Sequence, residues 1–254
     1  MERNSESESS LENQTHPHVS MQSIVDWRIL SQSPLLNKLN NEVVLSMLSV
    51  MRRDIWPRGY TLTSAENTNT RFYLILKGRI KICRSHSENG RELTLFLLGP
   101  GDGFNVLNMI DGSNEYFINN TLDEVEVVSA PVATWLEWLD QYPVLRTSMA
   151  EVAADHIQRL SELACELALD DAMTRLIHLL VRYFNNSSYG LNLIQDLPQE
   201  ELANMIGSVR PVVSRLLGEL KRDGLIYMDG GEIHVRDLNL LLNKASKRLV
   251  SLSK

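Results

Sequence analysis

Basic residues near the C-terminal end of the chain have the spacing of a helix edge that can contact DNA. One edge of a predicted helix carries Arg210, Ser214, Arg215 and Lys221, and the opposite face of the same segment is apolar. Arginine can form paired hydrogen bonds with guanine or bind a phosphate, and lysine neutralises phosphate charge. The segment 202–254 carries nine Lys and Arg against five Asp and Glu, although the whole chain has a net charge of −7. Such local positive charge indicates a nucleic-acid interface.

The residues around this edge predict a helix-turn-helix with a wing. A first helix is expected over Gln199 to Ile206, and Gly207 follows it where a tight turn needs a residue that tolerates positive φ. The second helix is expected over Arg210 to Asp223. Alternating residues on either side of Asp229-Gly230-Gly231 then predict a β-hairpin. This order of elements places the second helix in the major groove of DNA.

Several residues of this motif are predicted to contact DNA. Ser208 and Ser214 suit phosphate contacts, and Gln199 lies at the N-terminus of the first helix, where backbone N–H groups also attract phosphate. The alternative is an ordinary amphipathic helix pair whose charges are only solvated. The predicted DNA-contacting set is Gln199, Ser208, Val209, Arg210, Pro211, Ser214, Arg215 and Lys221.

Composition excludes several other classes of protein. Hydrophobic residues make up 43% of the 254 residues, and no apolar run approaches the ~20 residues that span a membrane. Residues 1–20 are acidic and rich in serine, which predicts a disordered tail rather than a signal sequence. Cys83 and Cys165 are the only cysteines. They suit free thiols in a reducing cytoplasm and are too few for an iron–sulfur cluster.

Upstream of the DNA-binding motif the pattern changes to short strands. A helix is expected over Trp27 to Met51, and short apolar runs separated by Gly, Pro, Asn and Ser follow it. Strands at this spacing predict a small barrel or jelly roll. The expected strands are 72–76, 80–83, 93–96, 125–128 and 133–135.

A long helix is expected from Pro143 to Leu169, between the strands and the DNA-binding motif. One stripe of its residues recurs at spacings of three and four, which is the periodicity of a coiled coil and predicts that two copies pair along it. The alternative is that this stripe packs on the barrel of its own chain. The stripe comprises Met149, Val152, His156, Leu160, Leu163 and Leu167.

Together these features predict an α+β protein with a jelly-roll barrel, a long helix and a winged helix-turn-helix. The expected parts are a disordered tail over 1–20, a sensing barrel over 21–142, a dimerisation helix over 143–170 and a DNA-binding domain over 171–254. No Ser/His/Asp arrangement, phosphate-binding loop or Cys/His cluster is apparent, so we expect neither catalytic residues nor a metal site. An interaction module of the same architecture is the alternative to a regulator.

The chain resembles the CRP/FNR superfamily of bacterial transcription regulators. The motifs that carry the resemblance are LKGRIKI, LGPGD, DDAMTRLIHLL and IGSVRPVVSRLLGELKRDGLI. The resemblance implies a homodimer on a palindromic DNA site, a signal sensed in the barrel, and an activator that contacts RNA polymerase. Pro211 stands where many members have a base-reading glutamate, so the half-site is expected to differ from theirs.

In members that bind cyclic nucleotides, a Gly-Glu pair holds the ribose and an Arg-Ser pair holds the phosphate. The corresponding positions here are Asn105-Val106 and Glu115-Tyr116. Because a carboxylate in place of the arginine repels an anionic phosphate, the resemblance predicts a signal other than cyclic AMP.

Within the superfamily, the chain is similar to the cyanobacterial global nitrogen regulator over 104–107, 125–131 and 206–220. That branch implies 2-oxoglutarate as the effector. Its anion-binding arginines align with Glu115 and His156, so we expect a different effector, or none.

No cofactor is assigned from the sequence. A haem ligated by His156 is one alternative, because some superfamily members sense gases through haem. The expected effector pocket comprises Phe104, Asn105, Val106, Leu107, Glu115, Tyr116 and His156.

Overall fold

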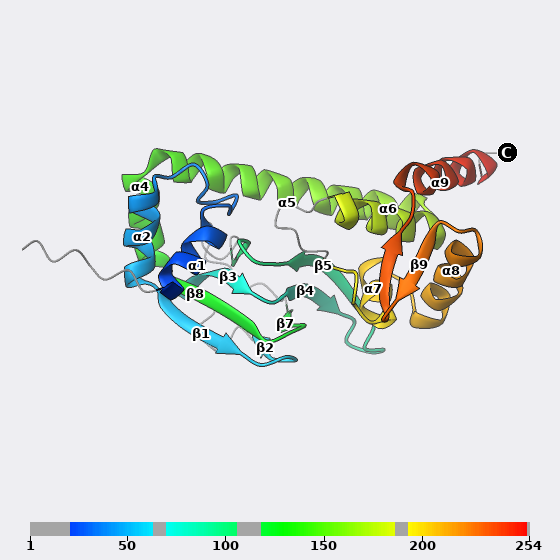
Figure 1. Ribbon diagram of the computed structural model, residues 1–254, viewed down its shortest axis with the longest axis horizontal. Coiled ribbons are helices and arrows are strands. Elements are labelled where there is room, and N and C mark those ends of the chain that lie inside the picture. The colour runs from blue at the N-terminus through cyan, green and yellow to red at the C-terminus, as the bar shows by residue number, and fades with distance from the viewer. Residues whose placement is uncertain (1–20, 63–69, 106–117, 186–192, 253–254) are drawn as a thin grey trace, which may run out of the picture.

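The computed structural model describes residues 21–62, 70–105, 118–185 and 193–252. A β-barrel, a long helix and a C-terminal DNA-binding domain follow one another in the order that the sequence predicts. Figure 1 shows the long helix along one side of the molecule, with the barrel towards one end and the C-terminal domain at the other. The mixed helix-and-sheet architecture is therefore as expected.

Two helices, α1 (Met21–Leu30) and α2 (Asn41–Val50), replace the single N-terminal helix expected over 27–51. The chain turns between them, and α2 begins because the Asn40 side chain accepts a hydrogen bond from the backbone N–H of Glu42 at 3.0 Å. A capping side chain of this kind starts a new helix inside a stretch whose apolar pattern looks continuous. The predicted single helix was wrong for this reason.

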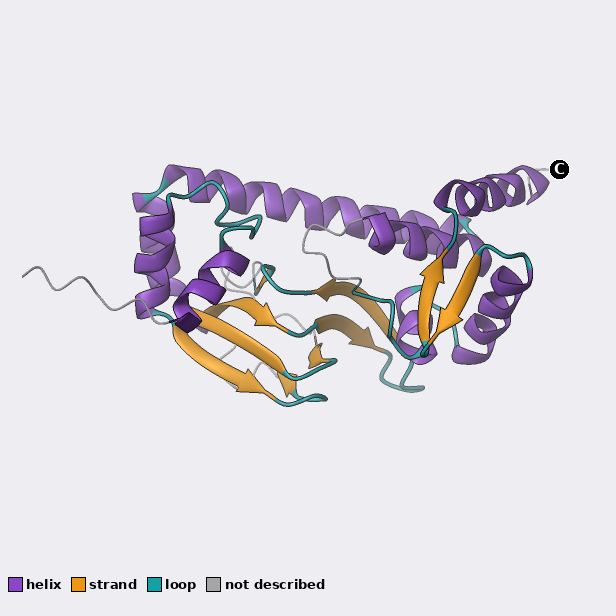
Figure 2. Ribbon diagram, in the orientation of Figure 1, coloured by secondary structure: helices purple, strands orange, loops and turns teal. Residues whose placement is uncertain are grey.

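The barrel is built from antiparallel strands in two layers (Figure 2). The described strands are β1 (Arg52–Trp56), β2 (Thr61–Leu62), β3 (Arg71–Lys77), β4 (Ile80–Ser85), β5 (Glu92–Leu98), β6 (Gly103–Phe104), β7 (Ile118–Thr121) and β8 (Val125–Pro131). One sheet has the order β1-β8-β3-β6 and the other β2-β7-β4-β5. Ile75 of β3 and Ile80 of β4 belong to one buried apolar cluster, so the two sheets share a core.

The segment 133–135, expected as a strand, is part of helix α4 (Val132–Gln141). β8 ends at Pro131, which has no N–H to continue a sheet, and the helix starts directly after it. Trp135 is fully buried, and its ring centroid lies 4.6 Å from that of Phe72. The apolar run that suggested a strand is therefore the side of a helix that packs on the barrel.

Helix α5 (Pro143–Leu169) has the predicted bounds, but the stripe expected to pair with a second copy faces the chain itself. Met149 lies in a buried cluster with residues of the barrel, and Leu163 is also buried. The His156 ring centroid lies 4.7 Å from that of Phe96 in β5. Met149, His156 and Leu163 of the stripe therefore pack within their own chain, as the alternative expects, and the pairing of two copies through the stripe stays a prediction.

The C-terminal domain is the predicted winged helix-turn-helix. Its elements are α6 (Ala172–Asn185), α7 (Gln199–Met205), α8 (Arg210–Arg222), β9 (Ile226–Asp229), β10 (Glu232–Val235) and α9 (Leu238–Leu252). Helices α7 and α8 form the helix-turn-helix, and the β9–β10 hairpin forms the wing. Helix α9, which the sequence pattern did not reveal, packs against α6. The apolar core of this domain includes Leu97 of β5, so it continues into the barrel.

Candidate nucleic-acid interface

Helix α8 separates its apolar and polar residues onto two faces. Val213, Leu216, Leu217 and Leu220 are buried in the core of the C-terminal domain. The exposed residues recur on the other face, and Figure 1 places α8 at the end of the molecule remote from α2 and α4. This face is therefore open to a large partner. Its exposed residues are Arg210, Pro211, Ser214, Arg215, Gly218, Lys221 and Arg222.

The turn before α8 needs glycine for two reasons. Gly207 has φ of +60°, in the left-handed region that favours glycine. A Cβ at this position would also lie 2.5 Å from Cδ2 of Leu167 on α5. Val209 caps α8 with extended backbone, and Pro211 occupies the first turn, where its missing N–H removes no helical hydrogen bond. The prediction of a glycine turn followed by a helix is confirmed.

The predicted contact residues outside α8 lie at the start of α7 and in the turn before α8. Gln199 begins α7 and is partly buried, as is Ser208 in the turn. Val209 is 44% exposed. The eight predicted residues thus gather around the start of α7 and the open face of α8. Sequence reasoning missed Gly218 and Arg222, although Gly218 lies four residues after Ser214 and Arg222 lies seven residues, or two helical turns, after Arg215.

The two carboxylates of α8 are bound by a lysine from another helix. Lys244 of α9 donates hydrogen bonds to Glu219, at 3.0 Å, and to Asp223. Because Lys244 donates to it, the pKa of Asp223 lies below its usual value. Lys244 therefore offsets the negative charge of α8, and the open face is dominated by its arginines and Lys221. The sequence did not reveal this contact because α9 itself was not predicted.

The wing combines aromatic stacking with an acidic tip. The Tyr227 and His234 rings stack with centroids 4.8 Å apart, and the Arg236 guanidinium lies 5.5 Å from the Tyr227 ring centroid. Asp229 and Glu232 flank the tip. Acidic residues at the tip do not suit phosphate contacts, so α8 carries the basic surface rather than the tip of the wing.

The barrel part of the expected effector pocket is only partly described. Phe104 is buried and stacks on Tyr73, with ring centroids 4.9 Å apart. Asn105 has φ of +72°, the only positive value for a residue other than glycine in the described residues, and its side-chain amide donates to the Arg71 carbonyl. Phe104 therefore belongs to the barrel core. Val106, Leu107, Glu115 and Tyr116 lie outside the described residues.

His156 lies apart from the Phe104 stack, in the wall of a cavity between α5 and the barrel. This cavity has a volume of about 280 Å³ and is also lined by Asp102, Glu151, Asp155 and Arg159. Burial lowers the pKa of His156 and raises the pKa of Asp102 to about 6. With three carboxylates against one arginine, the wall is acidic.

The two cysteines differ in exposure. Cys83 is buried in β4, as expected, and burial raises the pKa of its thiol to about 12. Cys165 on α5 is exposed. Within the described residues, no cluster of three or more His, Cys, Asp and Glu side chains is placed to hold a metal ion. None of the helices in the described part combines the length and apolar character that crossing a membrane requires.

Two protein-family models match the chain, one in each domain. The cyclic nucleotide-binding domain matches residues 54–142, and the Crp-like helix-turn-helix domain matches residues 174–243. These matches coincide with the barrel and with the winged helix-turn-helix.

Similar proteins extend the match across most of the chain. The CRP-like cAMP-activated global transcriptional regulator of Mycobacterium tuberculosis is 25% identical over 221 residues, which cover 85% of this chain and 98% of that protein. The global nitrogen regulator of Synechococcus elongatus is 29% identical over 184 residues, covering 70% and 82% respectively. The solved structure of FixK2 from Bradyrhizobium japonicum has the same fold, with a TM-score of 0.67 at 16% identity, and the match covers 76% of this chain and 96% of that chain.

The order of the two domains and the relatives lead to one conclusion. A barrel of the nucleotide-binding type precedes a Crp-like helix-turn-helix, and the relatives that share this layout are transcriptional regulators rather than enzymes. The chain belongs to the CRP/FNR family of transcription regulators.

Proposed function

We propose that the chain is a homodimeric regulator that binds palindromic DNA through α8 of each copy. Two such helices read half-sites about 34 Å apart, one turn of the double helix. The observation that carries the proposal is the open face of α8, whose cations are exposed while Lys244 binds the carboxylates of the same helix. The eight residues predicted to contact DNA stay the proposed contacts.

A free flank of α5 supports the pairing of two copies. Next to the stripe that packs on the barrel, exposed residues recur at alternating intervals of four and three. Most of them are small, which allows two helices to approach closely, and Ile157 among them is 69% exposed. The flank comprises Ala150, Ala154, Ile157, Ser161, Ala164 and Ala168.

Cross-linking tests this pairing. In a parallel pair, residue 157 of one copy faces residue 157 of the other, close to the Cα separation of about 4.4–6.8 Å that a disulfide requires. Ile157→Cys in a Cys165→Ser background is expected to form a covalent dimer on mild oxidation. The matched control is Gln158→Cys, one residue along on the exposed polar side, which should stay uncrosslinked. Equal cross-linking of both variants would contradict the pairing face.

DNA binding is tested with duplexes that the full-length protein selects from a random pool. We expect a palindrome to be enriched. The affinity of the protein for it should fall steeply with salt, because each phosphate contact releases counterions and contributes about −0.9 to the slope of log K against log salt concentration. Enrichment of no sequence, or an affinity indifferent to salt, would refute the proposal.

The signal is a ligand other than cyclic AMP. Glu115 and Tyr116 replace the residues that hold the nucleotide phosphate in the family, and the cavity beside His156 has an acidic wall. Both features disfavour an anion. Cyclic AMP and 2-oxoglutarate, each titrated against the protein–DNA complex, are expected to leave the affinity unchanged. A response to either at micromolar concentration would overturn this assignment.

The proposal extends to an activator that contacts RNA polymerase, in keeping with the family, and transcription in vitro from a promoter carrying the selected site tests it. A ligand-independent regulator and a haem-based sensor are the alternatives. Packing of His156 against Phe96 speaks against haem ligation at that residue. Visible absorbance of the purified protein decides this point, because a bound haem would absorb strongly near the blue end of the spectrum.

A further inference from the structure

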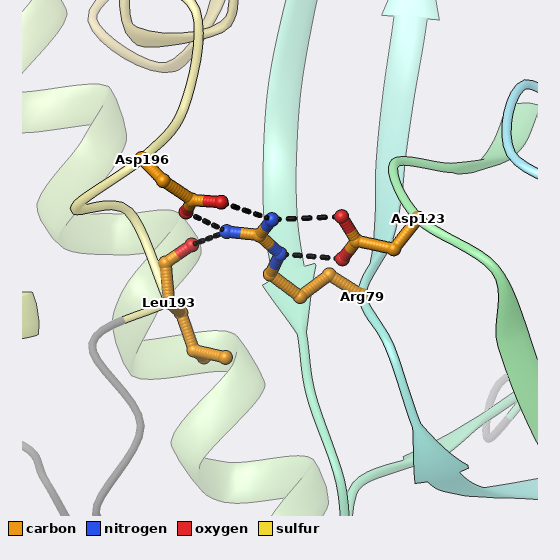
Figure 3. A network of polar contacts seen from close by, with 4 residues as sticks. All are labelled: Arg79, Asp123, Leu193 and Asp196. Carbon is orange, nitrogen blue, oxygen red and sulfur yellow. Dashed lines mark hydrogen bonds and ion pairs between the residues drawn. The ribbon is translucent and has the colours of Figure 1, made fainter. Parts of the chain in front are cut away.

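Arg79, in the turn between β3 and β4, joins the barrel to the DNA-binding domain (Figure 3). Its Nε and Nη2 donate to Asp123 of the barrel at 2.6 and 2.8 Å. Its Nη1 and Nη2 donate to Asp196, in the segment before α7, at 2.5 and 3.0 Å, and Nη1 also donates to the Leu193 carbonyl. Only 13% of the Arg79 side chain is exposed. The guanidinium is therefore held by both domains at once.

Lys81 makes a second, parallel connection. This lysine of β4 donates to Glu92 of the neighbouring β5 and to both carboxylate oxygens of Glu201 in α7, at 3.0 and 2.8 Å. The Lys81 side chain is 8% exposed and that of Glu201 is 19% exposed. Although burial opposes the charged form, the hydrogen bonds from Lys81 to Glu201 and Glu92 raise the pKa of Lys81 overall. We call Arg79 and Lys81, with Asp196 and Glu201, the interdomain clamp.

The clamp lies beside unfilled space. A cavity of about 550 Å³ is lined by Arg79, Asp196 and Leu193, and another of about 330 Å³ is lined by Lys81 and Glu201. The ion pairs therefore connect the two domains beside this space, in addition to the apolar core that Leu97 of β5 shares with the C-terminal domain. The domains also touch where Leu193 lies against Gly99.

The clamp fixes the direction in which α8 points. With Asp196 and Glu201 bound to the barrel, α7 is restrained against turning about the junction between α5 and α6, and α8, which lies at the end of the molecule in Figure 1, is restrained with it. In a dimer, this orientation sets the separation of the two recognition helices. A preorganised pair binds one separation well because no free energy is spent on ordering the domains.

We propose that Arg79 and Lys81 are positioning residues that determine which half-site spacing the dimer accepts. The effect on half-site spacing rests on the proposed function, whereas the restraint of α7 by the clamp does not. Without the clamp, each DNA-binding domain turns more freely, so the dimer accepts neighbouring spacings and no longer discriminates among them.

The test removes the charges of the two clamp carboxylates in the DNA-binding domain and leaves the barrel residues unchanged. The full-length double variant Asp196→Asn, Glu201→Gln is compared with the wild type on the selected palindrome and on versions with one base pair added or removed. The ratio of the affinities is the readout, because it cancels the general gain in affinity that follows from removing two negative charges. Hydrogen exchange in α7, measured without DNA, is the second readout.

A matched control removes a neighbouring ion pair that does not cross between the domains. Glu124→Gln breaks the exposed contact of Glu124 with Lys77, which are both barrel residues. This variant is expected to behave as the wild type. The single variant Asp196→Asn, whose target side chain is 53% exposed, serves if the double variant folds poorly.

We expect the double variant to lose about tenfold in spacing discrimination, the ratio that 1.4 kcal/mol produces, and to exchange faster in α7. Unchanged discrimination together with unchanged exchange would overturn the proposal. Faster exchange with unchanged discrimination would reject the role in spacing and leave a purely structural contact. If the wild type selects no palindrome, the proposed function fails, and the exchange arm still decides whether the clamp restrains α7.

Discussion

The open face of α8 and the junction between the two domains use cationic side chains in opposite ways. Arg210 and Arg215 on α8 are exposed, on a helix whose carboxylates are bound by Lys244. Arg79 and Lys81 at the barrel are nearly buried, and carboxylates of two domains surround them. The difference separates cations that are available to an outside partner from cations that organise the chain itself. This difference predicts different responses to substitution on the face of α8 and at the junction between the domains.

The largest expected effect on stability is at the junction between the domains. Arg79→Met leaves Asp123 and Asp196 without their common partner, and the free energy of unfolding should fall by about 3 kcal/mol. Lys77→Met, which breaks only an exposed pair, should change it by less than about 1 kcal/mol. Urea unfolding followed by circular dichroism measures both. Similar losses for the two variants would erase the contrast between buried and exposed cations.

On the open face of α8, the expected effect is on DNA binding and not on stability. Arg210→Ala and Arg215→Ala should each lower the affinity for the selected palindrome about 10- to 100-fold, because each removes a contact to a base edge or phosphate. The melting temperature should stay unchanged. Arg146→Ala, an exposed arginine on the barrel half of α5, is the control. Fluorescence anisotropy with labelled DNA gives the affinities, and full affinity in both α8 variants would contradict the interface.

A smaller effect is expected at Lys244, whose exposure lies between that of the cations on α8 and that of Arg79 and Lys81. Lys244→Met removes the cation that binds Glu219 and Asp223 beside the basic face, and the affinity for DNA should fall about fivefold at low salt. Adding Glu219→Gln and Asp223→Asn to this variant should restore the affinity, since the uncompensated charges are then gone. Failure of this rescue would mean that Lys244 acts through the packing of α9 instead.

The smallest expected effect is a dependence of stability on pH through His178, a partly buried cation. The Glu166 carboxylate, 3.6 Å from Nδ1 of His178, raises the pKa of His178, and Asp170 adds to this while Arg182 opposes it. The folded protein therefore binds the proton more tightly than the unfolded chain. The resulting stability is complete below pH of about 6.5 and is lost as the pH rises through the raised pKa. His178→Gln should flatten the difference in urea midpoint between pH 6 and 8, and an unchanged difference would exclude this residue as its source.

Local periodicity explains what the sequence could predict. The bounds of α5 and the start of α8 were predicted correctly, because apolar residues at helical spacing and the glycine turn act over a few residues. The sequence left two roles open for the stripe of α5, pairing with a second copy or packing on its own barrel, because two neighbouring flanks of this helix both carry the coiled-coil intervals. Only the packing of the barrel decides which flank is covered.

Contacts between distant residues account for the rest. Arg79 lies 117 residues from Asp196, and Lys81 lies 120 residues from Glu201, so no local pattern connects them. The helix α4 was predicted as a strand because its first residues continue the apolar pattern of β8. The N-terminal helix was predicted as one because the cap at Asn40 was not recognised.

The continuity of the C-terminal core with the barrel has a practical consequence for dissecting this regulator. A fragment beginning at Ala172 would lack Leu97 and Lys81, leaving an apolar patch and the Glu201 carboxylate bare. Such a fragment exposes apolar side chains and a carboxylate that the intact molecule covers, so it would aggregate more readily and be a poor surrogate in screens for target promoters. Fusing the C-terminal domain to the sensing barrel of another protein would succeed only if that barrel had an apolar surface in place of Leu97 and a cation in place of Lys81.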